Sequence, residues 1–329
     1  MQRILLAGFG LMGRKHADVY HLLPDACVVG VVDPRGEDLG ESLRATQLDG
    51  VPVFSSFASA MEEVECSVVD ICLPTDLHRT IALEAFVAGK HVFCEKPIAL
   101  TRRDASDMTL AAHLADRQFM VGHCIRFWPE YAWVRQAIVA GTYGRVLDAR
   151  FRRVAQPPAW GHQHFLKGAD SGGALFDLHV HDTDFVVHCF GRPAAVTSGG
   201  YSKVSGAVDH VTTLFRYPNG PVVTAEGSWA MTEGFGFNMA FTVNFERATV
   251  DFDIARGAEA LRLYAAGQSP ATIKPDGGDG YIGEIRHFIE SIHAGRAPTL
   301  VTAADAALSI EVCEAEERSV LTGQTVSLT

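Results

Sequence analysis

The sequence predicts an α/β fold with two domains: a doubly wound parallel sheet in residues 1–122, and an α+β domain with a large, mostly antiparallel open sheet in residues 123–329. Three observations support this prediction. The chain of 329 residues is long for a single hydrophobic core. Short apolar runs alternate with helical patterns in the first third. After residue 123, several runs have the two-residue period of strands.

The first third is predicted to contain parallel strands separated by helices. Its apolar runs carry hydrophobic side chains on both faces, which is typical of a sheet covered on both sides. Such a sheet requires right-handed crossovers and binds ligands at the carboxyl ends of its strands. The expected strands are residues 2–7, 28–32, 67–73 and 90–94, and the expected helices are residues 11–23, 77–89 and 101–116.

The first strand-to-helix turn has the sequence GFGLMG, with glycines in the G-x-G-x-x-G spacing. The first glycine permits a tight turn, the second lets the backbone approach a pyrophosphate, and the third lets the helix pack closely on the strand. The turn therefore predicts a Rossmann dinucleotide-binding domain, with a turn that serves packing alone as the alternative. The expected cofactor contacts here are Gly8, Phe9, Gly10, Leu11, Met12 and Gly13.

The residues after the second strand bear on the choice of dinucleotide. Asp33 follows Gly13 by about 20 residues, where a carboxylate can accept hydrogen bonds from the adenosine ribose hydroxyls. A carboxylate there would repel the 2'-phosphate of NADP, whereas the guanidinium of Arg35 could bind it. We therefore expect NAD as the cofactor, with NADP as the alternative.

Two further segments carry candidate catalytic groups. Lys96 lies in the sequence Glu95-Lys96-Pro97, at the carboxyl end of a predicted inner strand, and the alternative is a solvated lysine paired with Glu95. In SGGALFDLHVHDTDFVVHCFG, a helix would place Asp177, His181 and Asp184 on one face. A histidine flanked by carboxylates is suited to accept a proton near neutral pH, although an incidental histidine on a helix is the common case.

The combination of GFGLMG, CLPTDLHRTIALEAFVAGKHVFCEKPIAL and GGALFDLHVHDTD resembles the glucose-fructose oxidoreductase and inositol dehydrogenase family, Gfo/Idh/MocA. The resemblance extends from residue 3 to about residue 190, with weaker similarity in GHCIRFWPEY, AGTYGRV and YIGEIRHFIESIHAG. The EKP motif together with the D-x-x-x-H-x-x-D helix is far more specific than the glycine turn. His179 stands where many members have glycine, which leaves the substrate open.

The resemblance implies roles for individual residues. Lys96 matches the lysine that reaches the nicotinamide and the substrate hydroxyl, while Asp177 and His181 match the pair that binds and deprotonates the substrate alcohol. We expect the ammonium of Lys96 and the imidazole of His181 to converge on one pocket. Further cofactor contacts are expected from Pro74, Thr75, His78, Glu95 and Lys96, and further substrate contacts from Arg126, Trp160, His162 and Asp184.

The later part of the chain predicts the second sheet and its surroundings. Strand-period alternation occurs at residues 145–154, 208–217, 221–230 and 239–247, and a hairpin turn follows at Pro218-Asn219-Gly220. Helices are expected at about residues 281–294 and 303–321. Trp160, His162 and His164 lie on a connection that could close over a substrate or form an exposed linker. A broad sheet with one uncovered face favours a homodimer or homotetramer.

Composition limits the classes of partner and compartment. The net charge of −11, with no concentrated basic stripe, argues against nucleic acid, and no apolar run is long enough to cross a membrane. The 7 cysteines occur singly, as expected for free thiols in a reducing compartment. No signal segment is evident at the N-terminus. We expect a cytoplasmic protein that carries no metal.

These observations predict an NAD(P)-dependent dehydrogenase that moves a hydride between nicotinamide and a hydroxyl-bearing carbon of a sugar, polyol or inositol-type substrate. One alternative is a catalytically silent nucleotide-binding sensor with the same fold. Another is a zinc-dependent hydrolase, because Asp177-Leu178-His179-Val180-His181 also has the D-x-H-x-H pattern of a metal-binding strand.

Overall fold

The computed structural model describes residues 1–158 and 165–328, which form two compact units. Unit 1 comprises Met1–Cys124 and Asp279–Ala307, and unit 2 comprises Ile125–Gly278 and Leu308–Thr329. The predicted boundary between residues 122 and 123 falls beside the first junction. Residues 279–307, which the sequence interpretation placed in the second domain, lie instead in unit 1.

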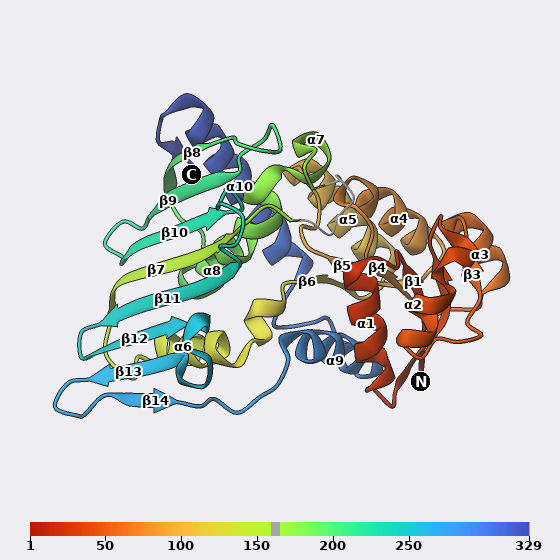
Figure 1. Ribbon diagram of the computed structural model, residues 1–329, viewed down its shortest axis with the longest axis horizontal. Coiled ribbons are helices and arrows are strands. Elements are labelled where there is room, and N and C mark those ends of the chain that lie inside the picture. The colour runs from red at the N-terminus through yellow and green to blue at the C-terminus, as the bar shows by residue number, and fades with distance from the viewer. Residues whose placement is uncertain (159–164, 329) are drawn as a thin grey trace. The chain divides into compact units, whose positions relative to one another are not determined.

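Unit 1 is built on a parallel sheet of six strands in the order β3-β2-β1-β4-β5-β6. The order reverses at β1, as in doubly wound sheets, so the predicted fold class is confirmed. Figure 1 shows α1 beside α9 on one side of this sheet and α4 beside α5 on the other. The strands are β1 (Gln2–Ala7), β2 (Ala26–Val32), β3 (Val53–Phe54), β4 (Val68–Ile71), β5 (His91–Glu95) and β6 (Phe119–Gly122). The helices are α1 (Leu11–His21), α2 (Gly40–Ala45), α3 (Phe57–Glu63), α4 (Thr75–Val87), α5 (Arg102–Ala115) and α9 (Gly280–His293), with a 3-10 turn at Gly36–Leu39.

The inner strands of unit 1 are buried on both faces. Every residue of β4 is buried, and so are the last four of β1. The late helix α9 belongs here because its apolar face is buried: Ile285 and Phe288 are fully buried, and the Phe288 ring lies 5.5 Å from that of Phe93 on β5. Residues 279–307 are distant in sequence from the rest of unit 1 but bury the apolar face of α9 there. A single boundary along the chain therefore assigns them to the wrong unit.

Unit 2 contains a mixed sheet of nine strands in the order β14-β13-β12-β11-β7-β10-β9-β8-β15, in which only β7 and β10 pair in parallel. The mostly antiparallel sheet predicted from the sequence is therefore confirmed. The strands are β7 (Val146–Ala155), β8 (Ala195–Tyr201), β9 (His210–Arg216), β10 (Val222–Ser228), β11 (Phe237–Phe245), β12 (Ala248–Asp253), β13 (Leu261–Ala265), β14 (Ala271–Ile273) and β15 (Val326–Ser327). The helices are α6 (Pro129–Ala140), α7 (Gly168–Ser171), a π-helical turn (Leu175–His179), α8 (Val180–Phe190) and α10 (Ala303–Thr322, which begins in unit 1), with 3-10 turns at Cys124–Phe127 and Ile254–Glu259.

One face of the nine-stranded sheet forms the core of unit 2. The ring of Tyr131 on α6 lies 4.9 Å from that of Phe185 on α8 and 5.0 Å from that of Phe241 on β11, with edge-to-face geometry. Side chains on the opposite face are half-buried or exposed and largely polar, such as Arg152, which donates to Glu226 at 3.2 Å. The sheet is thus hydrophobic on the helix-covered side and polar on the other.

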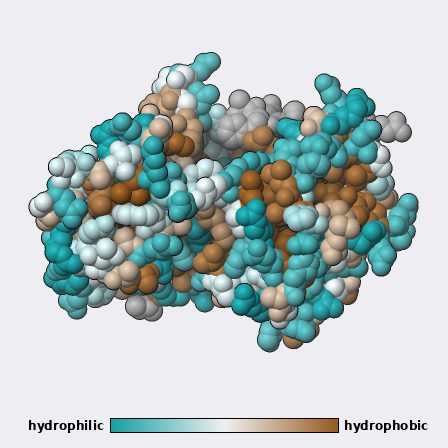
Figure 2. Space-filling view, turned by 90° about the horizontal axis from the view of Figure 1, so that it is seen from below, coloured by the Kyte–Doolittle hydropathy of each residue, from teal (hydrophilic) through white to brown (hydrophobic). Residues whose placement is uncertain are grey.

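The surface carries both polar and apolar residues. Hydrophilic residues are spread over the face in Figure 2, with apolar residues gathered mainly in its right half. In the described part of the chain, no helix combines the length and the apolar character needed to cross a bilayer.

Candidate active site

The turn between β1 and α1 has the geometry that the three glycines predict. Gly8 has φ +95, and a Cβ there would lie 2.5 Å from the carbonyl oxygen of Cys72. A Cβ on Gly13 would lie 2.0 Å from the carbonyl oxygen of Gly8, so helix and turn touch through backbone alone. A Cβ on Gly10, the N-cap of α1, would meet no atom of the described residues within 4 Å, and glycine supplies no side-chain cap. The N–H groups of the first helical turn are therefore open to an anionic group such as a pyrophosphate.

Asp33 and Arg35 form a compact pair beside this turn. The Arg35 guanidinium donates to Asp33 at 2.8 and 2.7 Å, and also to the carbonyl oxygen of Phe9 at 2.9 Å. The Phe9 amide donates to the Asp33 carboxylate at 3.0 Å. Burial alone would raise the pKa of Asp33, but these hydrogen bonds hold it below its usual range. Asp33 is therefore an anion that is hydrogen-bonded to Arg35. The Arg35 side chain itself remains 42% exposed.

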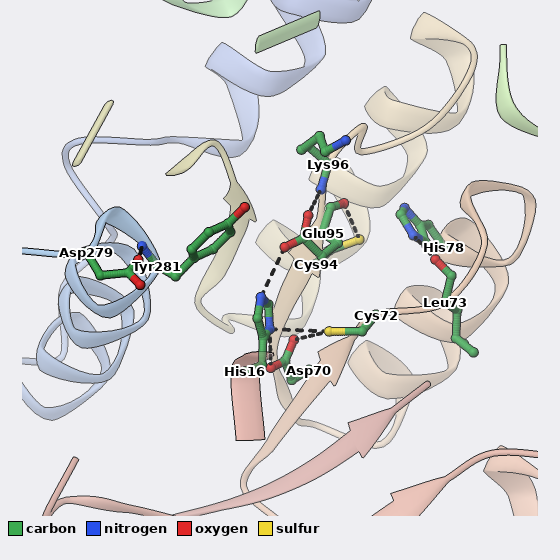
Figure 3. A network of polar contacts seen from close by, with 10 residues as sticks. All are labelled: His16, Asp70, Cys72, Leu73, His78, Cys94, Glu95, Lys96, Asp279 and Tyr281. Atoms are coloured by element: carbon green, nitrogen blue, oxygen red, sulfur yellow. Dashed lines mark hydrogen bonds and ion pairs between the residues drawn. The ribbon is translucent and has the colours of Figure 1, made fainter. Parts of the chain in front are cut away.

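Lys96 follows the last residue of β5 and is half-buried. Its backbone N–H donates to the Glu95 carboxylate at 3.0 Å (Figure 3). Since β1 and β5 are both parallel to β4, the glycine turn and Lys96 follow strand ends on the same edge of the sheet. Glu95, predicted to contact the cofactor, is only 5% exposed and bonds to His16 at 3.0 Å. Its carboxylate is thus turned into unit 1.

The loop after β4 contains Pro74, Thr75 and His78. His78 is 1% exposed, and its ring nitrogens lie 2.8 Å from the carbonyl oxygen of Leu73 and 2.9 Å from that of Pro97. Burial lowers the pKa of His78, although the hydrogen bonds to the Leu73 and Pro97 carbonyls act in the opposite direction. A ring so enclosed ties the loop to the Lys96-Pro97 turn rather than presenting a surface to a dinucleotide. Thr75 begins α4 and Pro74 precedes it as the N-cap.

Asp177 and His181 lie in unit 2, on the π-helical turn and on α8 respectively. Both are half-buried, as is Leu178, while His179, Val180 and Asp182 are buried. The π-helical turn lies against β10, because a Cβ on Gly227 would lie 2.4 Å from that of His179. Unit 2 therefore exposes parts of Asp177 and His181 while it packs the rest of the turn inward.

His179 has a structural role. It is fully buried, and its Nε2 lies 2.9 Å from Glu316 on α10, which also accepts from Thr183 at 2.9 Å. The hydrolase alternative is wrong because it requires Asp177, His179 and His181 to alternate along a strand, whereas residues 175–190 are helical. The helix turns His179 inward, so that it cannot join His181 in binding a metal.

Arg126 and Asp184 form a buried ion pair in unit 2. The guanidinium donates to both carboxylate oxygens, at 2.8 and 2.7 Å, and the two side chains are 1% and 0% exposed. Ser309 also donates to Asp184, at 3.0 Å. If Arg126 or Asp184 contacts a substrate, it must do so while the two side chains remain bonded to each other. Trp160, His162 and His164 lie outside the described residues.

Sequence reasoning missed a buried cluster in unit 1 made of His16, Asp70 and Glu284. Each is 0% exposed, and His16 lies 2.9 Å from Asp70. One signal was available: Asp70 interrupts the apolar run of β4, and a carboxylate inside a strand covered on both faces needs a partner. Nothing in the sequence pattern indicated which residue that partner is.

Comparison with known families identifies the class of protein. The family model described as "Oxidoreductase family, NAD-binding Rossmann fold" matches residues 2–123, and the GFO/IDH/MocA C-terminal domain matches residues 131–251. The chain belongs to the Gfo/Idh/MocA oxidoreductase family, as the sequence motifs predicted. Its N-terminal domain is an NAD-binding Rossmann domain, so the expectation of NAD is confirmed.

Individual relatives are distant and differ in activity. The 2,7-anhydro-N-acetylneuraminate hydratase of Escherichia coli (strain K12) is 28% identical, over 78% of this chain and 69% of that protein. The scyllo-inositol 2-dehydrogenase (NAD(+)) of Bacillus subtilis (strain 168) is 27% identical, over 99% of this chain and 96% of that protein. A levoglucosan dehydrogenase in complex with NADH and levoglucosan matches with a TM-score of 0.87 at 23% identity, over 99% of each chain, which shows the common fold.

Proposed function

We propose that the protein is an NAD-dependent dehydrogenase that removes a hydride from the hydroxyl-bearing carbon of a sugar, polyol or inositol-type substrate, or returns it. The observation that carries this proposal is the pairing, along one sheet edge, of an open glycine turn with Lys96. A lysine held beside a dinucleotide turn can stabilise negative charge on a reacting oxygen. Relatives that act on inositols and anhydrosugars support the substrate class.

Separate residues of this chain are proposed to bind the cofactor, accept the proton and stabilise the charge on the substrate oxygen. Bound NAD would supply the hydride acceptor, held by the turn at Gly8–Gly13 and by Asp33. His181 accepts the proton of the substrate hydroxyl, because imidazole titrates near neutral pH. Asp177 orients the substrate and His181, and the ammonium of Lys96 stabilises the alkoxide as its proton leaves. Arg126, Trp160 and His162 are proposed to bind the other hydroxyls.

We also propose that NAD is preferred over NADP. The Asp33 carboxylate is an anion after the second strand, where Rossmann folds bind the ribose hydroxyls, and it engages the Arg35 guanidinium, which could otherwise neutralise a 2'-phosphate. An NADP molecule would therefore have to separate Arg35 from Asp33 before it could bind well.

A homodimer or homotetramer is proposed through the polar face of the nine-stranded sheet. This face carries half-buried hydrogen-bonded groups, including Asn244, which donates to Asp148 at 3.0 Å. Light scattering of the purified protein in solution measures the subunit number, and a monomer at micromolar concentration would contradict this part of the proposal.

A second candidate is a net hydration or elimination, favoured by the relative from Escherichia coli, which is named as a hydratase. In such an enzyme the same groups would act without net change in the cofactor. The two candidates predict different products: the dehydrogenase releases NADH with a carbonyl compound, whereas the hydratase gains or loses water.

The test is an activity survey with NAD and NADP. Inositols, alditols, aldoses and anhydrosugars are incubated with the enzyme while NADH absorbance and product mass are followed. NADH formation with at least one substrate supports the dehydrogenase. A product that differs by the mass of water, without NADH, supports the hydratase. Binding of NAD with neither product across the panel would favour a silent sensor and contradict the proposal.

A further inference from the structure

His16 on α1 joins two strands of the unit 1 sheet through its two ring nitrogens (Figure 3). Nδ1 lies 2.9 Å from Asp70 on β4, and Nε2 lies 3.0 Å from Glu95 on β5. His16 and Asp70 are 0% exposed and Glu95 is 5% exposed. Water therefore has little access, and the three groups must satisfy one another.

The geometry favours a doubly protonated His16. A neutral imidazole has one donor and one acceptor nitrogen, whereas an ionised carboxylate only accepts hydrogen bonds. With a carboxylate at each nitrogen, only the doubly protonated ring donates to both. Burial alone would lower the pKa of His16, but the neighbouring Asp70 and Cys72 raise it well above its usual value. His16 is thus an imidazolium between two carboxylates.

A third carboxyl group lies next to the triad formed by Asp70, His16 and Glu95. Glu284 on α9 is 0% exposed, and neither of its oxygens has a hydrogen-bond partner in the described part of the chain. Burial and the charge of Glu95 raise its pKa well above the usual value, which favours its protonated, neutral form. The Cys72 thiol, after β4, lies 3.2 Å from His16 Nδ1, and the buried Tyr20 on α1 lies near Asp70; the pKa values of both groups are also raised.

Glu95 connects the triad to the backbone of Lys96. One of its oxygens faces His16, and the other accepts the backbone N–H of Lys96 at 3.0 Å. Burial would raise the pKa of Glu95, but the bond and charge of His16, followed by the charge of Lys96, lower it and keep the group ionised. On β6, a Cβ at Gly122 would lie 3.3 Å from the carboxyl carbon of Glu95, so the carboxylate has little room to turn.

We propose that His16 is a positioning residue: as an imidazolium held by Asp70, it fixes the Glu95 carboxylate and thereby sets the backbone and the charge environment of Lys96. This inference rests on the proposed function, in which Lys96 acts on the substrate oxygen. His16 itself is buried and does not meet the substrate.

Three of these buried groups have the spacing of a metal site, since ligand atoms of His16, Glu95 and Glu284 lie within 4.8 Å of one another. A metal would need a lone pair from a ring nitrogen of His16, but both nitrogens already face carboxylates. The imidazolium interpretation therefore accounts for all three groups without an ion. Stoichiometric metal in the purified enzyme, lost in His16→Gln, would overturn it.

The first test needs no catalytic activity. Histidine nitrogens are labelled with 15N, and the signals of His16 are assigned by their loss in His16→Gln. The proposal expects both ring nitrogens of His16 to remain protonated above pH 8, where an ordinary imidazole is neutral. A neutral ring at that pH would overturn the proposal.

The second test measures Lys96 directly in His16→Gln and Glu95→Gln. The rate of Lys96 acylation is followed against pH by peptide mass spectrometry. If His16 keeps Glu95 charged beside Lys96, both variants should shift acylation to lower pH, because the ammonium loses a neighbouring anion. Glu284→Gln is the matched control: it replaces a neutral acid in the same cluster, so the profile should not move. An unchanged profile in all three variants would overturn the proposal.

The third test uses turnover, if the wild type has it. His16→Gln should lower kcat by about 10-fold or more, with less than about 3-fold change in the Kd of NAD, because misplacing Lys96 affects the reacting centre rather than the binding of cofactor. A loss of kcat that only follows the loss of folded protein would mean a purely structural role. If the wild type turns over no substrate, the proposed function fails, and the first two tests still decide the role of His16.

Discussion

Two fully buried histidines, one in each unit, pair with a glutamate and do different things. His16 has carboxylates at both ring nitrogens, and through Glu95 it reaches the backbone of Lys96. His179 has Glu316 at one nitrogen, while its Nδ1 has no hydrogen-bond partner among the described residues. In our proposal the first is an imidazolium that positions Lys96, whereas the second anchors the π-helical turn to α10.

This contrast shows that the sequence neighbours of a histidine are a poor guide to its role. His179 stands between Asp177 and His181, yet the helical turn buries it on the opposite side. His16 stands outside the glycine motif and no local sequence pattern marks it, yet the packing of α1 on the sheet places its Nε2 3.0 Å from Glu95, the residue before Lys96. The predictions below probe each side of this contrast.

The largest effects are expected at Lys96 and His181, the half-buried groups proposed to act on the substrate. Lys96→Ala or His181→Ala should lower kcat by at least about 100-fold, since general acid–base and charge-stabilising groups contribute about 10² to 10⁴. NAD binding, measured by calorimetry, should survive in both. Lys274→Ala and His293→Ala, which remove exposed side chains of the same types, serve as controls. Near-normal turnover in either active-site variant would remove that residue from the mechanism.

A smaller effect is expected at the cofactor turn. Asp33→Ala removes the carboxylate and releases Arg35, so the ratio of affinities should move from NAD towards NADP by about tenfold, a change of about 1.4 kcal/mol. Arg35→Ala should weaken NADP binding without a comparable loss for NAD. Titration of each variant with both cofactors measures the ratio, and an unchanged ratio in Asp33→Ala would show that this carboxylate does not discriminate.

His179→Gln tests the structural half of the contrast. Loss of the imidazole leaves Glu316 buried without one of its partners, which should cost about 1–3 kcal/mol of unfolding free energy. Because His179 touches no reacting group in this account, kcat per folded molecule should change by less than about 3-fold, well below the loss expected from a general acid–base group. Denaturant unfolding and activity are measured on the same preparation. A loss of kcat as large as that of His181→Ala would place His179 in the catalytic group.

The smallest effect is a pH dependence of stability that comes from Glu284. Its folded-state pKa lies above the ordinary value of 4.5, so the folded state binds a proton that the unfolded state releases. This contribution is therefore lost as the pH rises from about 4.5 through the folded pKa. Glu284→Gln retains a neutral side chain at every pH, so its melting temperature relative to wild type should rise with pH. A constant difference from pH 5 to pH 9 would contradict a protonated Glu284.

The parts of the molecule that the sequence predicted are those set by local pattern. The run QRILLA followed by GFGLMG defines β1, the turn and the start of α1 because strand period and glycine spacing act over a few residues. Short strands escaped prediction: β3, with two residues, and β6 carry too little periodicity. The placement of α9 in unit 1 and the partners of His16 depend on which distant faces are buried together, which no local pattern contains.

The most direct test of the central claim follows the hydrogen on the carbinol carbon of a substrate found in the activity survey. The substrate is labelled with deuterium at that carbon and incubated with NAD and enzyme, and the cofactor is analysed by mass spectrometry. The account predicts one deuterium in the accumulated NADH for the wild type, and a rate at least about 100-fold lower for Lys96→Ala. Loss of the label to water, or equal label transfer by Lys96→Ala, would contradict it.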